Sequence, residues 1–172
     1  GGKTIDKYLT PFGIRSVKFD KDKGFFLNNK HLKLKGMCLH QDAGCLGTAV
    51  PDRAYERRLL ILKEFGTNAI RCSHNPPSPE FLNYCDSIGF LVIDEAFDKW
   101  KSGYYEEFFD SSWQQDISDM VIRDRNHPSV ILWSIGNELA EAKLKDDTGI
   151  ERAGMLQDFV HQLDPSRLVM LA

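Results

Sequence analysis

The strongest constraint on the fold is a repeated alternation of apolar runs with amphipathic segments. From residue 32 onward, short apolar runs of strand length are separated by segments with helical periodicity. The expected strands are 32–39, 68–72, 90–95, 130–135 and 167–172, and the expected helices are 52–65, 78–89, 113–125 and 148–163. Strands that are apolar throughout, each followed by a helix, indicate a parallel sheet covered by helices.

Two architectures share this rhythm, a doubly wound sheet and a (β/α) barrel. No phosphate-binding glycine motif follows any of the expected strands, so a nucleotide-binding sheet lacks its usual signature. A complete (β/α)8 barrel takes about 250 residues. Residues 32–172 supply four βα units and one further strand. We therefore expect an α/β fold that comprises about the first half of a TIM barrel, strands one to five.

The first 31 residues have a different pattern. Apolar and polar residues alternate over residues 14–31, with turn-forming residues between and after the alternating runs. We expect this segment to be a β-hairpin that leads into the barrel. Residues 1–13 are interpreted as the tail of a preceding β-domain.

Composition excludes several classes of partner. The net charge is −3, with acidic and basic residues interspersed, whereas nucleic-acid binders usually carry a basic patch. No apolar run approaches the roughly 18 residues that suggest a membrane span. We therefore expect the chain to bind neither nucleic acid nor a membrane. The chain begins at Gly1 without a methionine, so the sequence does not indicate a cellular compartment.

The four cysteines are expected to be buried or semi-buried free thiols. They are Cys38, Cys45, Cys72 and Cys85, and none belongs to a C-x-x-C motif. A Cys38–Cys45 disulfide is the alternative, and the spacings do not favour a zinc site.

Polar side chains gather at the carboxyl ends of four successive expected strands. These residues are His40 after the first, Arg71 and His74 at the second, Asp94 and Glu95 at the third, and Asn137 and Glu138 at the fourth. In a barrel those ends form one rim, where active sites of this fold lie. Taken singly, His40 and His74 are equally compatible with structural roles, and Asp94 could be a buried partner of Arg71.

The Asn137–Glu138 pair is the most informative of these features. A carboxylate at the end of an apolar strand carries a desolvation cost unless it is paired or used. Gly136 beside it permits unusual backbone angles or close packing. A partly buried acid suits protonation of a leaving-group oxygen, and an adjacent amide can bind a substrate hydroxyl. Glycoside hydrolysis asks for such a pair, with a second carboxylate about 5 Å away in retaining enzymes.

Longer runs extend this pattern into a family resemblance. They are F-G-I-R-S-V (12–17), L-K-L-K-G-M-C-L-H (32–40), N-A-I-R-C-S-H-N-P-P-S-P-E-F (68–81), G-F-L-V-I-D-E-A (89–96) and R-N-H-P-S-V-I-L-W-S-I-G-N-E (125–138). In these runs the chain resembles the catalytic domain of glycoside hydrolase family two, the group of β-galactosidases, β-glucuronidases and β-mannosidases. The resemblance implies a (β/α)8 barrel preceded by β-sandwich domains.

The resemblance also implies roles for the rim residues. Glu138 would be the general acid/base, and Arg71 would help to position the nucleophile. The implied substrate-binding side chains are His40, His74, Asn137 and Asp94, with Asn137 on the sugar's 2-hydroxyl and Asp94 either structural or substrate-facing.

The nucleophile of the family is a glutamate at the end of a later barrel strand. Neither Glu141 nor Glu151 occupies such a position. We therefore expect the nucleophile to lie beyond this chain, and the isolated 172-residue segment to be inactive.

A second departure concerns metal. Some β-galactosidases of the family hold magnesium with a Glu-x-His pair after strand three, where this chain has Asp98-Lys99-Trp100. We therefore expect no metal and no cofactor. Trp100, with Tyr104 and Tyr105, is expected either to form an aromatic wall for a sugar ring or to pack within its loop.

The favoured interpretation is part of a retaining exo-β-glycosidase acting on small carbohydrates, most closely a β-galactosidase. A β-glucuronidase or β-mannosidase is the alternative within the family, and homo-oligomerisation of a longer parent is left open. Two alternatives of other classes are a non-catalytic carbohydrate-binding module and a metal-dependent TIM-barrel hydrolase. The latter would use these ligands: His40, Asp42, His74, Asp94 and Glu138.

Overall fold

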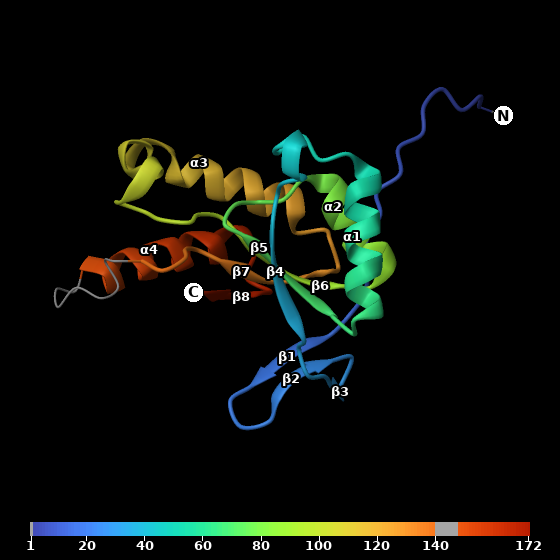
Figure 1. The fold of residues 1–172 in the computed structure, drawn as a ribbon, viewed down its shortest axis with the longest axis horizontal. Coiled ribbons are helices and arrows are strands. Elements are labelled where there is room, and N and C mark those ends of the chain that lie inside the picture. The colour runs from blue at the N-terminus through green and yellow to red at the C-terminus, as the bar shows by residue number, and fades with distance from the viewer. Residues whose placement is uncertain (1, 140–147) are drawn as a thin grey trace.

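The main body of the protein is a five-stranded parallel sheet in which neighbours in the chain are also neighbours in space. The structure is a computed structural model that describes residues 2–139 and 148–172. The strands are β4 (Gly36–His40), β5 (Ala69–Ser73), β6 (Leu91–Glu95), β7 (Val130–Ser134) and β8 (Leu168–Met170), paired in the order β4-β5-β6-β7-β8 (Figure 1). The sequence pattern predicts all five, although the first begins at Gly36 rather than at residue 32.

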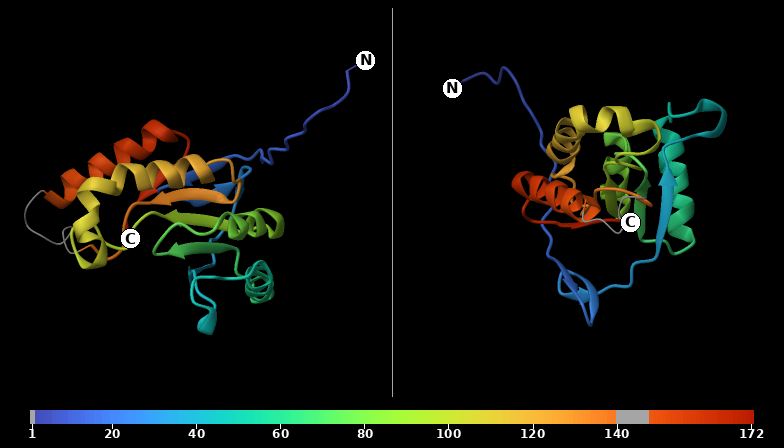
Figure 2. Two further views of the ribbon diagram at one scale, coloured as in Figure 1. Left: turned by 90° about the horizontal axis from the view of Figure 1, so that it is seen from above. Right: turned by 90° about the vertical axis from the view of Figure 1, so that its left-hand side faces the viewer.

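The helices decide between the two architectures that the sequence leaves open. They are α1 (Asp52–Glu64), α2 (Pro79–Ile88), α3 (Glu106–Asp124) and α4 (Thr148–Leu163). All four contribute to one apolar cluster with Ile70, Val92 and Trp133 of the sheet, and Figure 2 shows them following the curve of the strands. A doubly wound sheet places helices on both faces, whereas consecutive strands with helices on one face curve into a barrel. The fold is therefore a partial α/β barrel, as predicted.

Side chains on each strand alternate between the helix-covered face and the opposite one, which we call the open face. On β5, Ile70 and Cys72 face the helices, and Arg71 lies between them. The pairing with β7 shifts by one residue: Val92 pairs with Val130, but Ile93 pairs with Leu132. Ile131 is therefore an extra residue, and both it and Leu132 join the apolar cluster of the open face. The bulge returns Trp133 to the helices and Ser134 to the open face.

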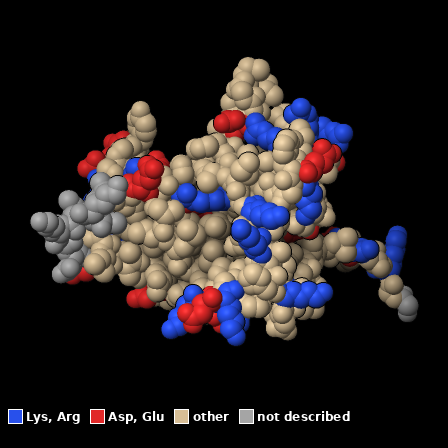
Figure 3. All heavy atoms as spheres, turned by 60° about the horizontal axis from the view of Figure 1, so that its bottom comes forward, with Lys and Arg blue, Asp and Glu red and all other residues tan. Residues whose placement is uncertain are grey.

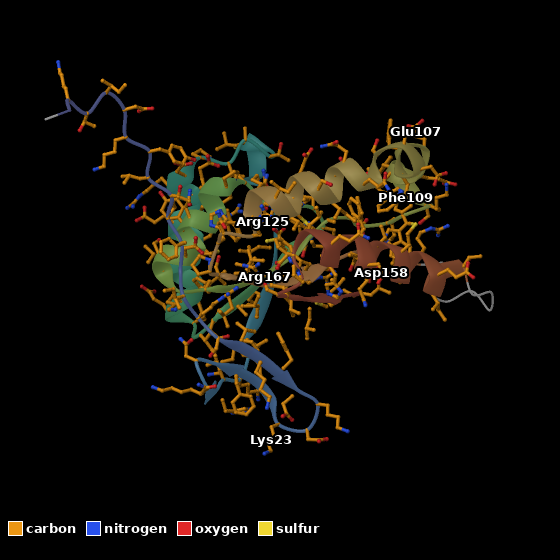
Figure 4. All side chains as sticks on the ribbon, turned by 180° about the vertical axis from the view of Figure 1, so that it is seen from behind. Lys23, Glu107, Phe109, Arg125, Asp158 and Arg167 are labelled. Atoms are coloured by element: carbon orange, nitrogen blue, oxygen red, sulfur yellow. The ribbon has the colours of Figure 1, made fainter. Side chains whose placement is uncertain are left out.

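A small antiparallel sheet closes the lower end of the open face. Its strands are β1 (Val17–Asp20), β2 (Gly24–Leu27) and β3 (Lys30–His31), with the order β1-β2-β3. Phe25 of β2 is buried in a cluster with Ala69 and Leu91, which begin β5 and β6. Lys23, labelled in Figure 4, marks the β1–β2 turn far from the helices. Residues 17–31 thus contain the expected hairpin and a short third strand.

Local sequence signals place most helix ends. Ser78 accepts a hydrogen bond from the Phe81 amide, and Pro79 begins α2. Gly89 ends it in the left-handed conformation, with φ at 84°. Two expected helix boundaries were wrong. Helix α1 ends at Glu64, so Phe65, the expected last residue, lies just beyond it and is 82% exposed. Helix α3 begins at Glu106 rather than near residue 113.

The junction between α4 and β8 supports β7 from the helix side. Asp164 accepts hydrogen bonds from Trp133 Nε1 (2.9 Å) and Arg167 Nη1 (2.5 Å), and Ser166 donates two more. Burial alone would raise the pKa of Asp164, but these hydrogen bonds lower it to about 2. Arg167, labelled in Figure 4, also donates to the carbonyl of Arg125.

Surface properties complete the description. On the face drawn in Figure 3, basic and acidic side chains are interspersed around a broad area of other residues. Across residues 2–139 and 148–172, no helix has the length and apolar character needed to cross a membrane.

The four cysteines are free thiols. Cys72 and Cys85 are buried, as expected, but Cys38 and Cys45 are exposed.

Candidate active site

The core of the candidate site is an ion pair on the open face between β5 and β6. Arg71 Nε donates to Oε2 of Glu95 (2.8 Å), and Nη2 lies 2.6 Å from the same oxygen. The Glu95 side chain is 0% exposed and also accepts from Ser134 Oγ on β7 (2.7 Å). Parallel pairing explains the meeting, because Arg71 is opposite Ile93, and Glu95 lies two residues further on the same face. Glu95 thus binds side chains from both neighbouring strands, although the sequence analysis chose Asp94 as the site residue of this strand.

His74 extends the pair beyond the end of β5. Its Nδ1 lies 2.7 Å from Oε1 of Glu95 and 3.5 Å from Nη2 of Arg71. A carboxylate can only accept, so Nδ1 carries the proton, and Nε2 remains for another partner. The exposed His40 at the end of β4 meets His74 edge to face, with ring centroids 5.2 Å apart. The two histidines therefore lie side by side and form one wall of the rim.

Asn137 connects this wall to the loop after β6. Its side chain is buried, and Oδ1 accepts a hydrogen bond from Arg71 Nη2 (2.8 Å). Its Nδ2 donates to Oδ1 of Asp98 (2.8 Å). Burial raises the pKa of Asp98, but hydrogen bonds from Asn137 and Lys99 outweigh burial and hold this pKa below its ordinary value. The amide is fixed at both ends, so its orientation is set before any ligand binds.

Glu138 occupies the position that the sequence gives it but not the expected environment. Its side chain is 79% exposed rather than partly buried. Its backbone φ is 46°, a left-handed conformation that costs a non-glycine residue about 1–3 kcal/mol. The Glu138 amide donates to the Ala172 carbonyl (2.8 Å), which helps to hold that turn. At this turn the Asn137 side chain points into the protein, whereas the Glu138 side chain points into solvent.

Asp94 does not join the rim, so of its two expected roles the geometry fits the structural one and not the substrate-facing one. It points to the helix face, where it is completely buried beside Asp124 of α3. Burial, followed by the charge of Asp124, raises the pKa of Asp94 well above its ordinary value. Asp124 is itself bound by Arg123 through two hydrogen bonds. The alternative pairing of Asp94 with Arg71 is also excluded by this geometry, since Arg71 faces Glu95.

The aromatic residues after β6 do not form a common wall. Trp100 is fully buried and donates from Nε1 to the Ile135 carbonyl (2.6 Å), whereas Tyr104 is fully exposed. Tyr105 stacks on Phe97 and donates to Asp116. Trp100 therefore packs within the structure, which was the second of the two expectations.

The residues proposed for a metal-dependent hydrolase are also not brought together. His74 is bound to Glu95, and Asp94 faces the other side of the sheet. Among the described residues, no group of three or more histidine, cysteine or acidic side chains is arranged to hold a metal ion. Glu151 is exposed in the first turn of α4, and Glu141 lies outside the described residues.

Comparison with known proteins agrees with the partial barrel fold. Residues 17–172 match the family model described as "Glycosyl hydrolases family 2, TIM barrel domain". Beta-galactosidase BoGH2A of Bacteroides ovatus is 51% identical over 164 residues, which is 91% of this chain and 19% of that protein. A beta-glucuronidase of Bacteroides fragilis is 34% identical over 172 residues, 96% of this chain and 24% of that protein.

Among solved structures, a family 2 glycosyl hydrolase from Bacteroides cellulosilyticus superposes with a TM-score of 0.89 at 48% identity. The match covers 94% of this chain and 21% of that one. This chain therefore spans about a fifth of the length of the proteins that it matches.

Proposed function

We propose that this chain, which belongs to family 2 of the glycosyl hydrolases, supplies the acid/base half of the active site of a retaining exo-β-glycosidase. The observation that carries the proposal is the Asn137–Glu138 turn at the end of β7. It presents a carboxyl group to solvent beside an amide that Arg71 and Asp98 hold in place. A side chain that is fixed on both sides suits recognition of a sugar hydroxyl, here the 2-hydroxyl.

In the proposed first step, a carboxylate from another part of the complete protein attacks the anomeric carbon. The bond from that carbon to the leaving oxygen breaks, and Glu138 gives its proton to the oxygen. In the second step Glu138 takes a proton from water, whose oxygen displaces the enzyme carboxylate from the anomeric carbon. Glu95 cannot be the attacking group, because it is fully buried and bound by Arg71, His74 and Ser134.

The other rim residues receive supporting roles. Nε2 of His74 is proposed to bind a sugar hydroxyl, with His40 beside it. Arg71 is proposed to help position the attacking carboxylate, while its Nη2 holds Asn137. We propose a terminal β-galactoside as the substrate, because BoGH2A, at 51% identity, is named a beta-galactosidase. The name of the Bacteroides fragilis relative keeps β-glucuronides as the second candidate.

The test uses the complete protein with Glu138→Ala and an aryl β-galactoside that has a good leaving group. Loss of Glu138 should lower kcat by about 10²–10⁴-fold, the usual contribution of a general acid/base. Azide should restore turnover and give a β-configured glycosyl azide, because an activated leaving group needs no proton and azide needs no base.

Unchanged hydrolysis by this variant in the absence of azide would refute the role of Glu138. Parallel assays of the unaltered protein with aryl β-galactosides, β-glucuronides and β-mannosides identify the sugar. A preference for either of the latter two would overturn the galactoside assignment alone.

A further inference from the structure

Three consecutive residues after β6, Asp98 to Trp100, hold the segment that carries the proposed acid/base. We call these three residues the clamp. Each of them bonds to a different part of residues 135–138, at the end of the neighbouring strand β7. None of these bonds is part of the sheet pairing, since β6 ends at Glu95.

Trp100 forms the buried end of the clamp. It is 0% exposed, and its Nε1 donates to the Ile135 carbonyl (2.6 Å). Gly136 is needed for this contact. A Cβ at that position would lie 3.1 Å from Trp100 Nε1 and 2.8 Å from Leu139 Cδ1. The indole therefore fixes the backbone just before Asn137.

Asp98 forms the middle of the clamp. Its carbonyl accepts from the Asn137 amide (2.9 Å), and its carboxylate accepts from the Asn137 side chain (2.8 Å). The backbone N–H and the side-chain Nδ2 of Asn137 thus both donate to Asp98. The backbone and side chain of Asn137 cannot move independently of the loop after β6.

Lys99 forms the outer part of the clamp and brings a positive charge to Glu138. Its Nζ donates to the Asn137 carbonyl (2.9 Å) and to Asp98 Oδ1 (2.9 Å), and lies 3.9 Å from Glu138 Oε2. The first two contacts fix the ammonium group itself. A fixed cation beside an exposed carboxylate restricts the positions that this carboxylate occupies. Exposed ion pairs contribute little to stability. We therefore expect this contact to orient the Glu138 carboxylate rather than to stabilise the fold.

We propose that Lys99 is a positioning residue that holds the Glu138 carboxyl group where it transfers the proton to the leaving oxygen. This inference rests on the proposed function, because it assumes that Glu138 is the acid/base. Lys99 does not touch the sugar in this account. It acts only through Glu138 and through the backbone of Asn137.

The experiment compares two substrates of the complete protein that share one sugar. One is an aryl glycoside with a good leaving group, which needs little help from an acid, and the other is an alkyl glycoside, which needs full protonation. Lys99→Met should lower kcat/KM for the alkyl glycoside by about 10–100-fold, the scale expected for a misplaced catalytic group. For the activated aryl glycoside the loss should stay within about threefold, because proton transfer contributes little there.

Two further variants separate positioning from general damage. Lys99→Arg keeps a cation and should recover most of the alkyl glycoside activity. Lys18→Met is the control, because Lys18 also forms an ion pair with an acid, Asp20 (3.1 Å), but lies on β1 away from the rim; it should leave both substrates unchanged.

Equal losses on both substrates for Lys99→Met, or no loss on either, would overturn the proposal. Failure of azide to rescue Glu138→Ala would instead overturn the proposed function. The two failures are therefore distinguishable.

Discussion

Asp94 and Glu95 are neighbours in one strand, both completely buried, yet their environments are opposite. Glu95 faces the open side and is bound by Arg71, His74 and Ser134. Asp94 faces the helices, where its neighbour is another acid, Asp124. A strand of period two thus separates a carboxyl group bound by three side chains from one that burial favours as the neutral acid.

The two carboxyls teach that burial alone does not define a functional group. What distinguishes Glu95 is its three hydrogen-bond partners, which are Arg71 on β5, His74 just after β5 and Ser134 on β7. Substitutions on the open face should therefore affect activity as well as stability, whereas those on the helix face should affect stability alone.

The largest effect is expected for Glu95→Gln. The amide cannot accept every bond that the carboxylate accepts now, and it leaves Arg71 without its ion-pair partner. Breaking a buried pair in this way costs about 3–5 kcal/mol of unfolding free energy. Because Arg71 and His74 lose their anchor, kcat/KM of the complete protein should also fall by about 100-fold. Thermal unfolding and steady-state assays measure the two effects. A variant with normal activity would remove Glu95 from the site.

An intermediate effect is expected for Asp164→Asn, a helix-face acid that does have partners. The change removes the ion pair with Arg167 but keeps an acceptor for Trp133, so we expect a loss of about 1–3 kcal/mol at neutral pH. The folded-state pKa of about 2 lies below the ordinary 3.8. The stabilisation is therefore present above pH 3.8 and is lost as the pH falls toward 2.

Unfolding free energy measured across this acid range checks the Asp164 prediction. The parent and the variant should converge at the acid end, while activity at neutral pH changes little. A difference that grows as the pH falls would contradict the assignment of the low pKa to these hydrogen bonds.

The smallest effect, and the one of opposite sign, is expected for Asp94→Asn. The raised pKa of Asp94 means that the folded state binds this proton more tightly than the unfolded chain does. Stability from this group is therefore complete at acid pH and falls as the pH rises above the ordinary value of 3.8. An asparagine is neutral throughout and can donate to Asp124. We expect stabilisation by about 1 kcal/mol at neutral pH and almost none at acid pH.

Melting temperatures at two pH values test the Asp94 prediction, and Asp124→Asn is the matched control. The control should destabilise the protein, because Arg123 loses a partner to which it donates two hydrogen bonds. If Asp94→Asn destabilises the protein equally at both pH values, Asp94 is an ordinary paired carboxylate and the comparison fails.

The sequence predicts the order of the strands and helices well because apolar runs and helix caps are local signals. Ser78, Pro79 and Gly89 place both ends of α2 from their own chemistry. The prediction of a barrel rested on the missing glycine motif and on the family resemblance. Strands that are apolar throughout do not reveal which face the helices cover, and the structure shows it.

The same limitation explains the choice of Asp94 over Glu95. In L-V-I-D-E every residue is buried or nearly so, and no polar alternation indicates which face each side chain takes. The pairing of Arg71 with Ile93 settles the matter, and pairing is a long-range property. The exposure of Glu138 was missed for another reason: it depends on a left-handed turn at a residue type that seldom adopts one.

The bulge at Ile131 has a consequence for how this chain tolerates changes in length. Because Ile131 is the extra residue, its deletion would leave Val92 opposite Val130 and Ile93 opposite Leu132 in regular pairing. Trp133 would keep the helix face and Ser134 the open face. One residue inserted between Leu132 and Trp133 would instead exchange the faces of both, because the side-chain period of a strand is two, and would turn Ser134 away from Glu95. The strand should therefore tolerate the loss of Ile131 better than the gain of a residue beside Trp133.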